Sequence, residues 1–184
     1  MTKYIVLLRG VTPTGKNRVP MAQLRQLLAE SGFQNVQTWI QSGNVILCSE
    51  LSVEEVVKRV NKIIKESIGA DLKIIVKTPA EIETVIAENP FGERYAISRV
   101  FFTLFNDIPD INLVAALQAQ DFGQDEFIFT PHAIYLFIPG SAAKTKLNNN
   151  FLERKLRIDA TTRNFNTLSK LIALSANPQA SQWK

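Results

Sequence analysis

The chain has 184 residues and a formal net charge of +4, with 46% hydrophobic and 21% charged residues. This length can bury a sizeable core, and the absence of a charged-then-apolar leader and of an 18-residue apolar run predicts a globular cytoplasmic protein that does not enter a membrane. A single cysteine, Cys48, excludes an internal disulfide, and we interpret it as a buried apolar side chain.

Apolar periodicity and capping residues divide the first half of the chain into strands and helices. Ser52 with Glu55 three residues later predicts a capping box, and Thr78-Pro79-Ala80-Glu81 predicts another at the last helix of this half. In chain order, strands are expected over 4–8, 36–40, 45–48 and 72–77, and helices over 20–32, 52–69 and 78–86.

The second half shows the same order of elements after the breaker Asn89-Pro90-Phe91-Gly92. Apolar positions recur at a spacing of 89 residues, from Phe33 to Phe122 and from Leu47 to Leu136, which indicates an internal duplication. In chain order, strands are expected over 100–105, 126–129, 134–138 and 160–163, and helices over 111–119, 145–156 and 166–174.

Two successive βαββαβ runs predict an α+β protein with two ferredoxin-like halves, each followed by a helix, whose antiparallel sheets carry helices on one face. We place the N-terminal half at 1–89, a linker at 90–97, the C-terminal half at 98–176 and a tail at 177–184. The other sheet faces can be covered by each other or by the trailing helices. On such a face we expect four aromatic side chains, and we favour core packing over stacking on RNA bases for them: Phe101, Phe105, Tyr135 and Phe137.

Basic charge is concentrated in two segments of the chain. Residues 1–29 contain five basic side chains and no acid, and residues 144–170 contain seven basic side chains and two acids. The remainder of the chain is net negative. Two basic segments indicate an anionic partner if they meet in the folded protein.

The loop after the first strand has the G-x-x-x-x-G-K spacing of a phosphate-binding loop, from Gly10 to Lys16. Asn17 stands where such a loop has the Ser or Thr that holds Mg²⁺, and Pro20 begins the helix too late for its N-terminus to face a phosphate. The sequence therefore disfavours a nucleotide triphosphatase and favours a looser anion-binding loop.

In a ferredoxin-like half, this loop and the turn between the second and third strands lie at the same end of the sheet. Their side chains offer hydrogen-bond donors without a carboxylate, which suits an anion better than a metal ion. The same residues would equally suit a solvated loop in which Gly and Asn serve turn geometry. The predicted anion-binding set is Arg9, Gly10, Lys16, Asn17, Arg18, Gln41, Ser42 and Asn44, with Lys146 and Arg163 from the second half as closing residues.

Polar residues also interrupt the predicted helix at 145–156, which contains three consecutive Asn residues although Asn is a poor helix former. Leu147, Leu152 and Leu156 supply its apolar stripe. Asn164 or Asn166 is expected to cap the last helix, but capping accounts for only part of the polar run.

Four short motifs are spread along the chain. They are Leu7-Leu8-Arg9-Gly10 with Gly15-Lys16-Asn17, then Trp39-Ile40-Gln41-Ser42-Gly43-Asn44-Val45, then Lys146-Leu147-Asn148-Asn149, and Thr161-Thr162-Arg163-Asn164-Phe165-Asn166-Thr167. Together they resemble the bacterial family called domain of unknown function 1697, over nearly the whole chain. The resemblance implies an α+β architecture with ferredoxin-like halves, and it supplies no catalytic residues to carry over, since the family has no established activity. The chain departs from the family pattern in the Thr-Pro-Thr insertion at 12–14 and in Phe165, where the family usually has Trp.

Few residues of this chain offer catalytic chemistry. Cys48 and the single histidine, His132, lie in different halves, so neither a metal cluster nor a Cys/His pair is expected, and we interpret His132 as a hairpin-turn residue. No metal and no cofactor are therefore expected. The leading hypothesis is a protein that binds an anionic small molecule, a nucleotide or a nucleic acid at the basic loops. The alternatives are an enzyme acting on a phosphorylated or carboxylated substrate in the same pocket, and a scaffold that forms homo-oligomers.

Overall fold

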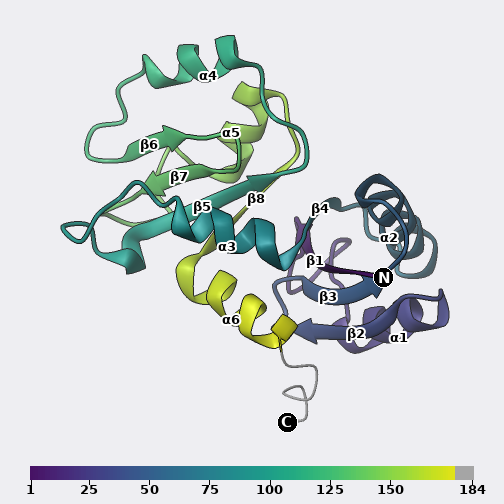
Figure 1. Ribbon diagram of the computed structural model, residues 1–184. Helices are drawn as coiled ribbons and strands as arrows, with labels where there is room; N and C mark the ends of the chain where they lie inside the picture. Colours follow the sequence, from purple (N-terminus) through teal and green to yellow (C-terminus); the bar gives the residue numbers. More distant parts are fainter. Residues whose placement is uncertain (177–184) are drawn as a thin grey trace. The chain divides into compact units, whose positions relative to one another are not determined.

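A computed structural model describes residues 1–176 of the chain (Figure 1), and the tail predicted at 177–184 lies outside these residues. The first elements are β1 (Thr2–Arg9), α1 (Met21–Glu30), β2 (Gln34–Trp39), β3 (Asn44–Ser49), α2 (Val53–Ser67), β4 (Lys73–Lys77) and α3 (Pro79–Ala87). The later ones are the short 3-10 turn η1 (Ile97–Arg99), β5 (Val100–Phe105), α4 (Ile111–Gln118), β6 (Glu126–Phe129), β7 (Ile134–Phe137), α5 (Asn149–Leu156), β8 (Ala160–Asn164) and α6 (Phe165–Ala176). Their order is the one that the sequence predicts.

The eight strands form two four-stranded antiparallel sheets, with the orders β2-β3-β1-β4 and β6-β7-β5-β8. In each sheet the first and third strands are central and the second and fourth are at the edges. This is the strand order of a ferredoxin-like βαββαβ unit. The predicted α+β fold class with two ferredoxin-like halves is confirmed.

Residues 1–176 divide into two compact units: unit 1 consists of Met1–Ala80 together with residues 169–176, and unit 2 is Glu81–Leu168. The boundaries fall inside α3 and α6. The helices that trail each predicted half therefore contribute to the other unit. In unit 1 the Lys3 ammonium donates to the Ser175 carbonyl near the end of α6. In unit 2 the Tyr135 hydroxyl donates to the Val85 carbonyl of α3 at 2.9 Å.

In unit 1, α1 and α2 cover one face of the first sheet (Figure 1). Helix α2 begins at the predicted capping box, in which Ser52 and Glu55 exchange hydrogen bonds. Alternate residues of β1 meet apolar residues spaced three or four apart on both helices, each buried side chain stabilising the fold by about 1.5–3 kcal/mol. This core includes Tyr4, Val6, Leu8, Leu24, Leu28, Val56, Val60 and Ile64.

In unit 2, the four aromatic side chains predicted on one sheet face lie on two faces. Phe101 and Phe105 belong to the core beneath α4 and α5, and Phe105 is only 1% exposed, as expected for a core residue. Tyr135 is opposite Phe102 in the β5–β7 register and packs edge-on against its ring, so it lies on the other face. Phe105 and Tyr135 are buried as core packing requires, whereas Phe101 and Phe137 are only half-buried. The placement of all four side chains on one face is wrong because Phe101 is opposite Leu136 rather than Tyr135 or Phe137.

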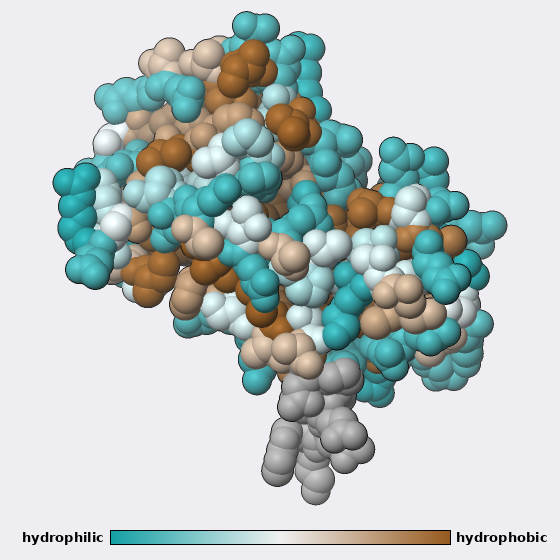
Figure 2. Space-filling view, in the orientation of Figure 1, coloured by the Kyte–Doolittle hydropathy of each residue, from teal (hydrophilic) through white to brown (hydrophobic). Residues whose placement is uncertain are grey.

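None of the helices within residues 1–176 is long and apolar enough to cross a membrane. On the face shown in Figure 2, hydrophobic side chains form separate patches among hydrophilic ones. The most exposed large hydrophobic side chains of unit 2 are Ile108 and Ile111, near the start of α4, which are 63% and 65% exposed.

Candidate functional site

The loop between β1 and α1 is closed by its own backbone hydrogen bonds. The Thr12 N–H donates to the Asn17 carbonyl at 3.0 Å, and the Arg18 N–H donates to the Gly15 carbonyl at 3.2 Å. The φ angles of Gly10 and Gly15 are +95° and +81°, which favour glycine. Two of the loop N–H groups are thus bonded inside the loop, whereas a phosphate cradle requires such groups to face the anion.

This loop and the β2–β3 turn lie against each other, as expected from the topology. Gln41 Nε2 donates to the Val19 carbonyl at 2.8 Å, and the Leu8 N–H donates to the Gly43 carbonyl at 2.8 Å. A Cβ on Gly43 would lie 2.7 Å from Leu8 Cβ and 2.9 Å from Val11 Cγ2. Only glycine therefore permits this close approach of the two loops.

Two of the polar side chains predicted to bind a ligand here hold the loops in place. Asn44 is fully buried, and its Nδ2 donates to the Trp39 carbonyl at 3.3 Å and to Ser42 Oγ at 3.0 Å. Asn17 Oδ1 accepts a hydrogen bond from the Asp71 N–H at 3.3 Å, which ties the loop to the chain before β4. Since a buried amide needs these partners, Asn44 contributes to the fold of the turn.

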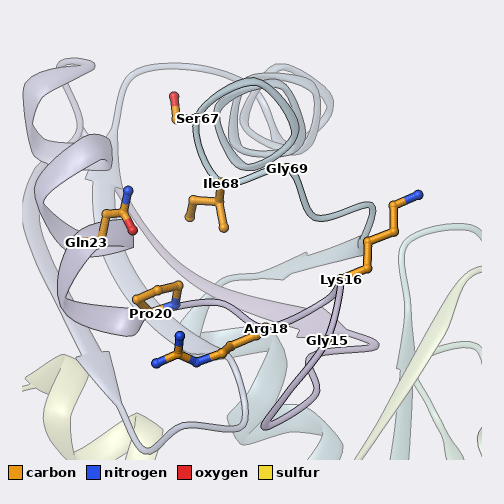
Figure 3. Close-up of a pocket in the computed structure, with 8 residues that line it drawn as sticks. All are labelled: Gly15, Lys16, Arg18, Pro20, Gln23, Ser67, Ile68 and Gly69. Carbon is orange, nitrogen blue, oxygen red and sulfur yellow. The ribbon is translucent and has the colours of Figure 1, made fainter.

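Lys16 and Arg18 line an open depression of about 430 Å³ between the loop, the start of α1 and the end of α2 (Figure 3). Helix α1 has Pro20 at its N-cap position, with no side-chain cap and no acidic residue in its first turn. The free N–H groups of such a helix end carry partial positive charge. The lining is Gly15, Lys16, Arg18, Pro20, Gln23, Ser67, Ile68 and Gly69, and it contains no carboxylate.

The two cationic side chains of the depression extend in different directions. In Figure 3, Arg18 runs along Pro20 at the start of α1, while Lys16 points away from it. Ile68 and Gly69 follow the end of α2, whose carbonyls carry partial negative charge. Both cations are exposed, so their rotamers can change when an anion binds, and Arg18 is the one that already lies beside the positive helix end.

The remaining predicted binding residues are outside the lining of this depression. Arg9 is half-buried at the end of β1, opposite Lys73 in the register with β4. Lys146 is exposed before α5, and Arg163 of β8 donates to Thr161 Oγ1 at 2.6 Å and to the Thr162 carbonyl at 3.0 Å. Lys146 and Arg163 belong to unit 2, and the other eight predicted residues belong to unit 1.

The Asn run before α5 has a structural explanation. Asn148 Oδ1 accepts from the Phe151 N–H at 3.0 Å and caps α5, which begins at Asn149 rather than at the predicted residue 145. Asn149 Nδ2 donates to the Ala160 carbonyl, and its Oδ1 accepts from Thr162 Oγ1, both at 2.6 Å. Asn164 caps α6, with its Oδ1 accepting from the Thr167 N–H at 2.8 Å. Two residues of the run therefore serve capping and contacts between α5 and β8.

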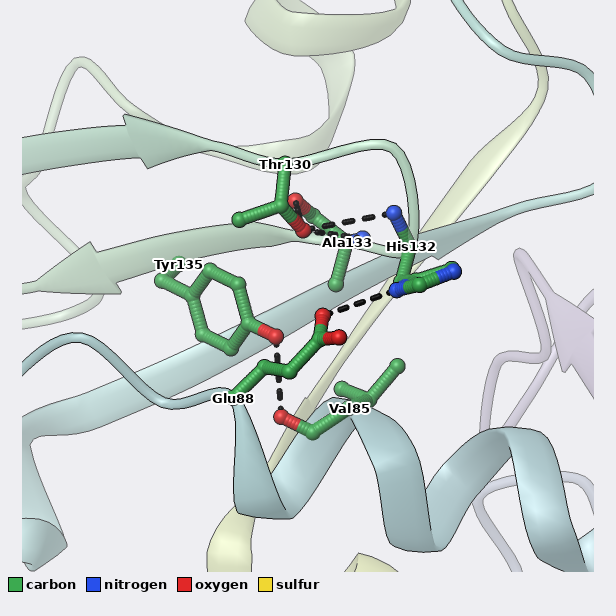
Figure 4. A network of polar contacts seen from close by, with 6 residues as sticks. All are labelled: Val85, Glu88, Thr130, His132, Ala133 and Tyr135. Atoms are coloured by element: carbon green, nitrogen blue, oxygen red, sulfur yellow. Dashed lines mark hydrogen bonds and ion pairs between the residues drawn. The ribbon is translucent and has the colours of Figure 1, made fainter.

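A polar network in unit 2 joins α3 to the β6–β7 turn (Figure 4). His132 Nδ1 lies 2.7 Å from Glu88 Oε2, and 44 residues separate the two. The pKa of the neighbouring Tyr135 hydroxyl is raised to about 12, chiefly by burial; the Thr130 side chain opposes this shift and the Glu88 carboxylate contributes to it. The sequence does not predict this network, because no local spacing connects Glu88 with a turn so distant along the chain.

Cys48 is buried in β3, as interpreted from the sequence, and its Sγ lies 3.8 Å from Asn35 Nδ2. In residues 1–176, no three side chains of His, Cys, Asp or Glu are grouped as ligands of a metal ion. The depression beside Lys16 and Arg18 is thus lined by cations, amides and helix ends rather than by metal ligands.

Comparison with known proteins identifies a family and a fold. A family model described as protein of unknown function (DUF1697) matches residues 1–135. The solved structure of the conserved bacterial protein SP0830 from Streptococcus pneumoniae is similar, with a TM-score of 0.75 and 23% identity, covering 95% of this chain and 98% of that chain. At this identity the likeness concerns the fold alone. No curated protein matches the chain significantly.

Proposed function

Since the chain belongs to the family described as protein of unknown function DUF1697, we propose from the geometry of unit 1 that it is a cytoplasmic protein that binds an anionic ligand beside Lys16 and Arg18 without a metal ion. One observation supports this proposal most directly. Two cations share an open depression with the uncapped start of α1, and no carboxylate lines it. Anions are stabilised at helix N-termini, and adjacent basic side chains add charge-assisted hydrogen bonds.

The size of the depression favours a nucleotide or a phosphorylated metabolite. A volume of about 430 Å³ lies within the range of small-molecule sites. Its lining lacks the His, Asp and Glu side chains that most often act as general acids and bases, so this site better supports binding than the alternative of an enzyme using the same pocket. A nucleic acid would contact the same cations through its phosphates and would depend strongly on salt.

Calorimetric titration of the full chain with pyrophosphate, ATP and a single-stranded oligonucleotide tests the proposal. We expect Arg18→Ala and Lys16→Ala each to weaken binding of the anion that titrates by about 1–3 kcal/mol, the contribution of a hydrogen bond to a charged group. Lys62→Ala is the matched control, because Lys62 is an exposed lysine of α2 that pairs with Glu66 at 4.0 Å and does not line the depression. Equal losses of affinity in all three variants would indicate non-specific attraction of the anion to surface charge. The absence of binding heat with every probe would refute the proposal.

Self-association is the second candidate function, and the exposure of Ile108 and Ile111 favours it. These two isoleucines, three residues apart in the sequence, are 63% and 65% exposed and offer apolar surface to a second copy. Sedimentation velocity over a range of protein concentrations, with Ile111→Lys for comparison, distinguishes a dimer that this surface forms from a monomer.

A further inference from the structure

The pair of His132 and Glu88 in unit 2 has the geometry of a carboxylate–imidazole dyad. His132 Nδ1 and Glu88 Oε2 are 2.7 Å apart, and the two side chains are 53% and 42% exposed. When Nδ1 donates its proton to the carboxylate, the neutral imidazole keeps an unshared electron pair on Nε2. In Figure 4 the other ring nitrogen of His132 points away from Glu88, so a reagent from solvent can reach it.

Both members of this dyad are held on rigid supports. The Glu88 N–H donates to the Thr84 carbonyl at 2.9 Å. The buried Tyr135 hydroxyl donates to the Val85 carbonyl and so holds the last turn of α3 in place. On the other side, Thr130 Oγ1 accepts hydrogen bonds from the N–H groups of His132 and Ala133, each at 3.2 Å. A carboxylate that orients an imidazole from a fixed position makes the ring a better base and nucleophile.

We propose that Nε2 of His132, oriented by Glu88, is a nucleophile that takes an acyl group from activated carboxylic esters and transfers it to water. Nε2 attacks the carbonyl carbon, an N–C bond forms, the ester C–O bond breaks, and the alkoxide or phenolate leaves with the electron pair. Glu88 stabilises the positive charge on the acylated ring through the Nδ1 proton. Water then attacks the acyl carbon, and the N–C bond breaks with its electron pair returning to Nε2. The water oxygen becomes part of the carboxylic acid, and one proton is released. This proton balances the alkoxide or phenolate anion released in the first step.

Charge selects acyl donors over phosphoryl donors at this dyad. Among the described residues, His132 is the side-chain partner of Glu88, and no lysine or arginine forms an ion pair with Glu88. The Glu88 carboxylate would repel an anionic phosphoryl donor, whereas an ester is uncharged. The proposed site belongs to unit 2 and is independent of the anion-binding depression in unit 1.

Hydrolysis of p-nitrophenyl acetate by the full chain tests this proposal. We expect His132→Ala and Glu88→Gln each to lower the rate by about tenfold or more, because the first removes the nucleophile and the second removes the carboxylate that orients it. Because His132 is the only histidine, an acyl-imidazole trapped by rapid quenching must map to the peptide that contains it. Lys144→Ala is the control for acylation of surface amines, because Lys144 is an exposed lysine of the same unit.

Three results would overturn the proposal. An unchanged rate in His132→Ala would assign the esterolysis to another group. A loss in His132→Ala but not in Glu88→Gln would show an ordinary exposed imidazole rather than a dyad. Phosphorylation of His132 by phosphoramidate without turnover of the ester would contradict the choice of acyl donors. Circular dichroism of each variant separates loss of the dyad from loss of the fold.

Discussion

The two hairpin turns occupy equivalent places in the two sheets but use their polar residues differently. The β2–β3 turn packs against the β1–α1 loop, so that Asn44 is fully buried and Gly43 meets Leu8 and Val11. The β6–β7 turn closes on itself, with the Thr130 N–H donating to the Ala133 carbonyl at 2.9 Å, and leaves His132 exposed. A polar residue in a turn is available for chemistry only where the turn does not need it as a packing contact.

Gly43→Ala should have the largest effect on this comparison. The added Cβ would lie 2.7 Å from Leu8 Cβ, at a φ of +82° that L-residues rarely adopt. Left-handed strain costs about 1–2 kcal/mol and overpacking about 1–3 kcal/mol, so we expect a loss of about 3 kcal/mol in the free energy of unfolding, measured with urea. Gly15→Ala is the matched control, because Gly15 has a φ of +81° and no atom within 4 Å of its added Cβ. Equal losses in both variants would show that the turn does not pack closely.

Asn44→Ala should have the next largest effect. The variant leaves the Trp39 carbonyl and Ser42 Oγ without the amide that donates to them, and the group it replaces is fully buried. We expect a loss of about 2 kcal/mol in urea unfolding, within the range for buried hydrogen-bonding groups. In the other turn, His132→Ala should cost less than about 1 kcal/mol, because exposed ion pairs contribute little. If Asn44→Ala lost less free energy of unfolding than His132→Ala, the β6–β7 turn rather than the β2–β3 turn would be the one that needs its polar residue for stability.

The sequence predicts the elements of both units because each element carries its own local signal. The capping box at Ser52 and the continuous apolar run of β1 depend on residues a few positions apart, and both are present. The destinations of α3 and α6 have no such signal, because a trailing helix has the same apolar face whichever sheet it covers. The register of β5 with β7 likewise decides which aromatic side chains share a face, and it depends on pairing rather than on composition.

At the candidate site too, local sequence patterns do not predict which polar residues tertiary contacts will bury. Topology brings the first loop to the β2–β3 turn, but polar character alone does not separate Asn44, which is buried, from Lys16, which is exposed. The distinction depends on the close contact of Gly43 with Leu8, a tertiary feature. The Glu88–His132 pair is a contact across 44 residues, for which one sequence offers no spacing rule.

Tyr135 beneath the second turn predicts a loss of stability at alkaline pH. Its pKa in the fold is raised to about 12, so the unfolded state releases the proton first, and the contribution to stability is complete below about pH 10 and lost as the pH rises toward 12. Tyr135→Phe should cost about 1 kcal/mol at neutral pH, because the hydrogen bond to the Val85 carbonyl is lost. In urea unfolding, the stability advantage of the unsubstituted chain over Tyr135→Phe should shrink as the pH rises above 10. A difference that stays constant above pH 10 would contradict this expectation.

Lys16→Ala and Arg18→Ala should have the smallest effect on stability, and this result matters most for the comparison of structural with available polar residues. Both side chains are exposed, whereas Gln41 in the adjacent turn, although exposed, donates to the Val19 carbonyl. Surface substitutions away from such contacts change the free energy of unfolding by less than about 0.5 kcal/mol, so we expect each cation variant to stay within that limit and Gln41→Ala to exceed it, with a loss near 1 kcal/mol. Urea unfolding of the three variants measures the difference. If Lys16→Ala or Arg18→Ala destabilised the chain as much as Gln41→Ala, the cations would be part of the loop structure, and a loss of anion binding in those variants would no longer identify the depression as the site.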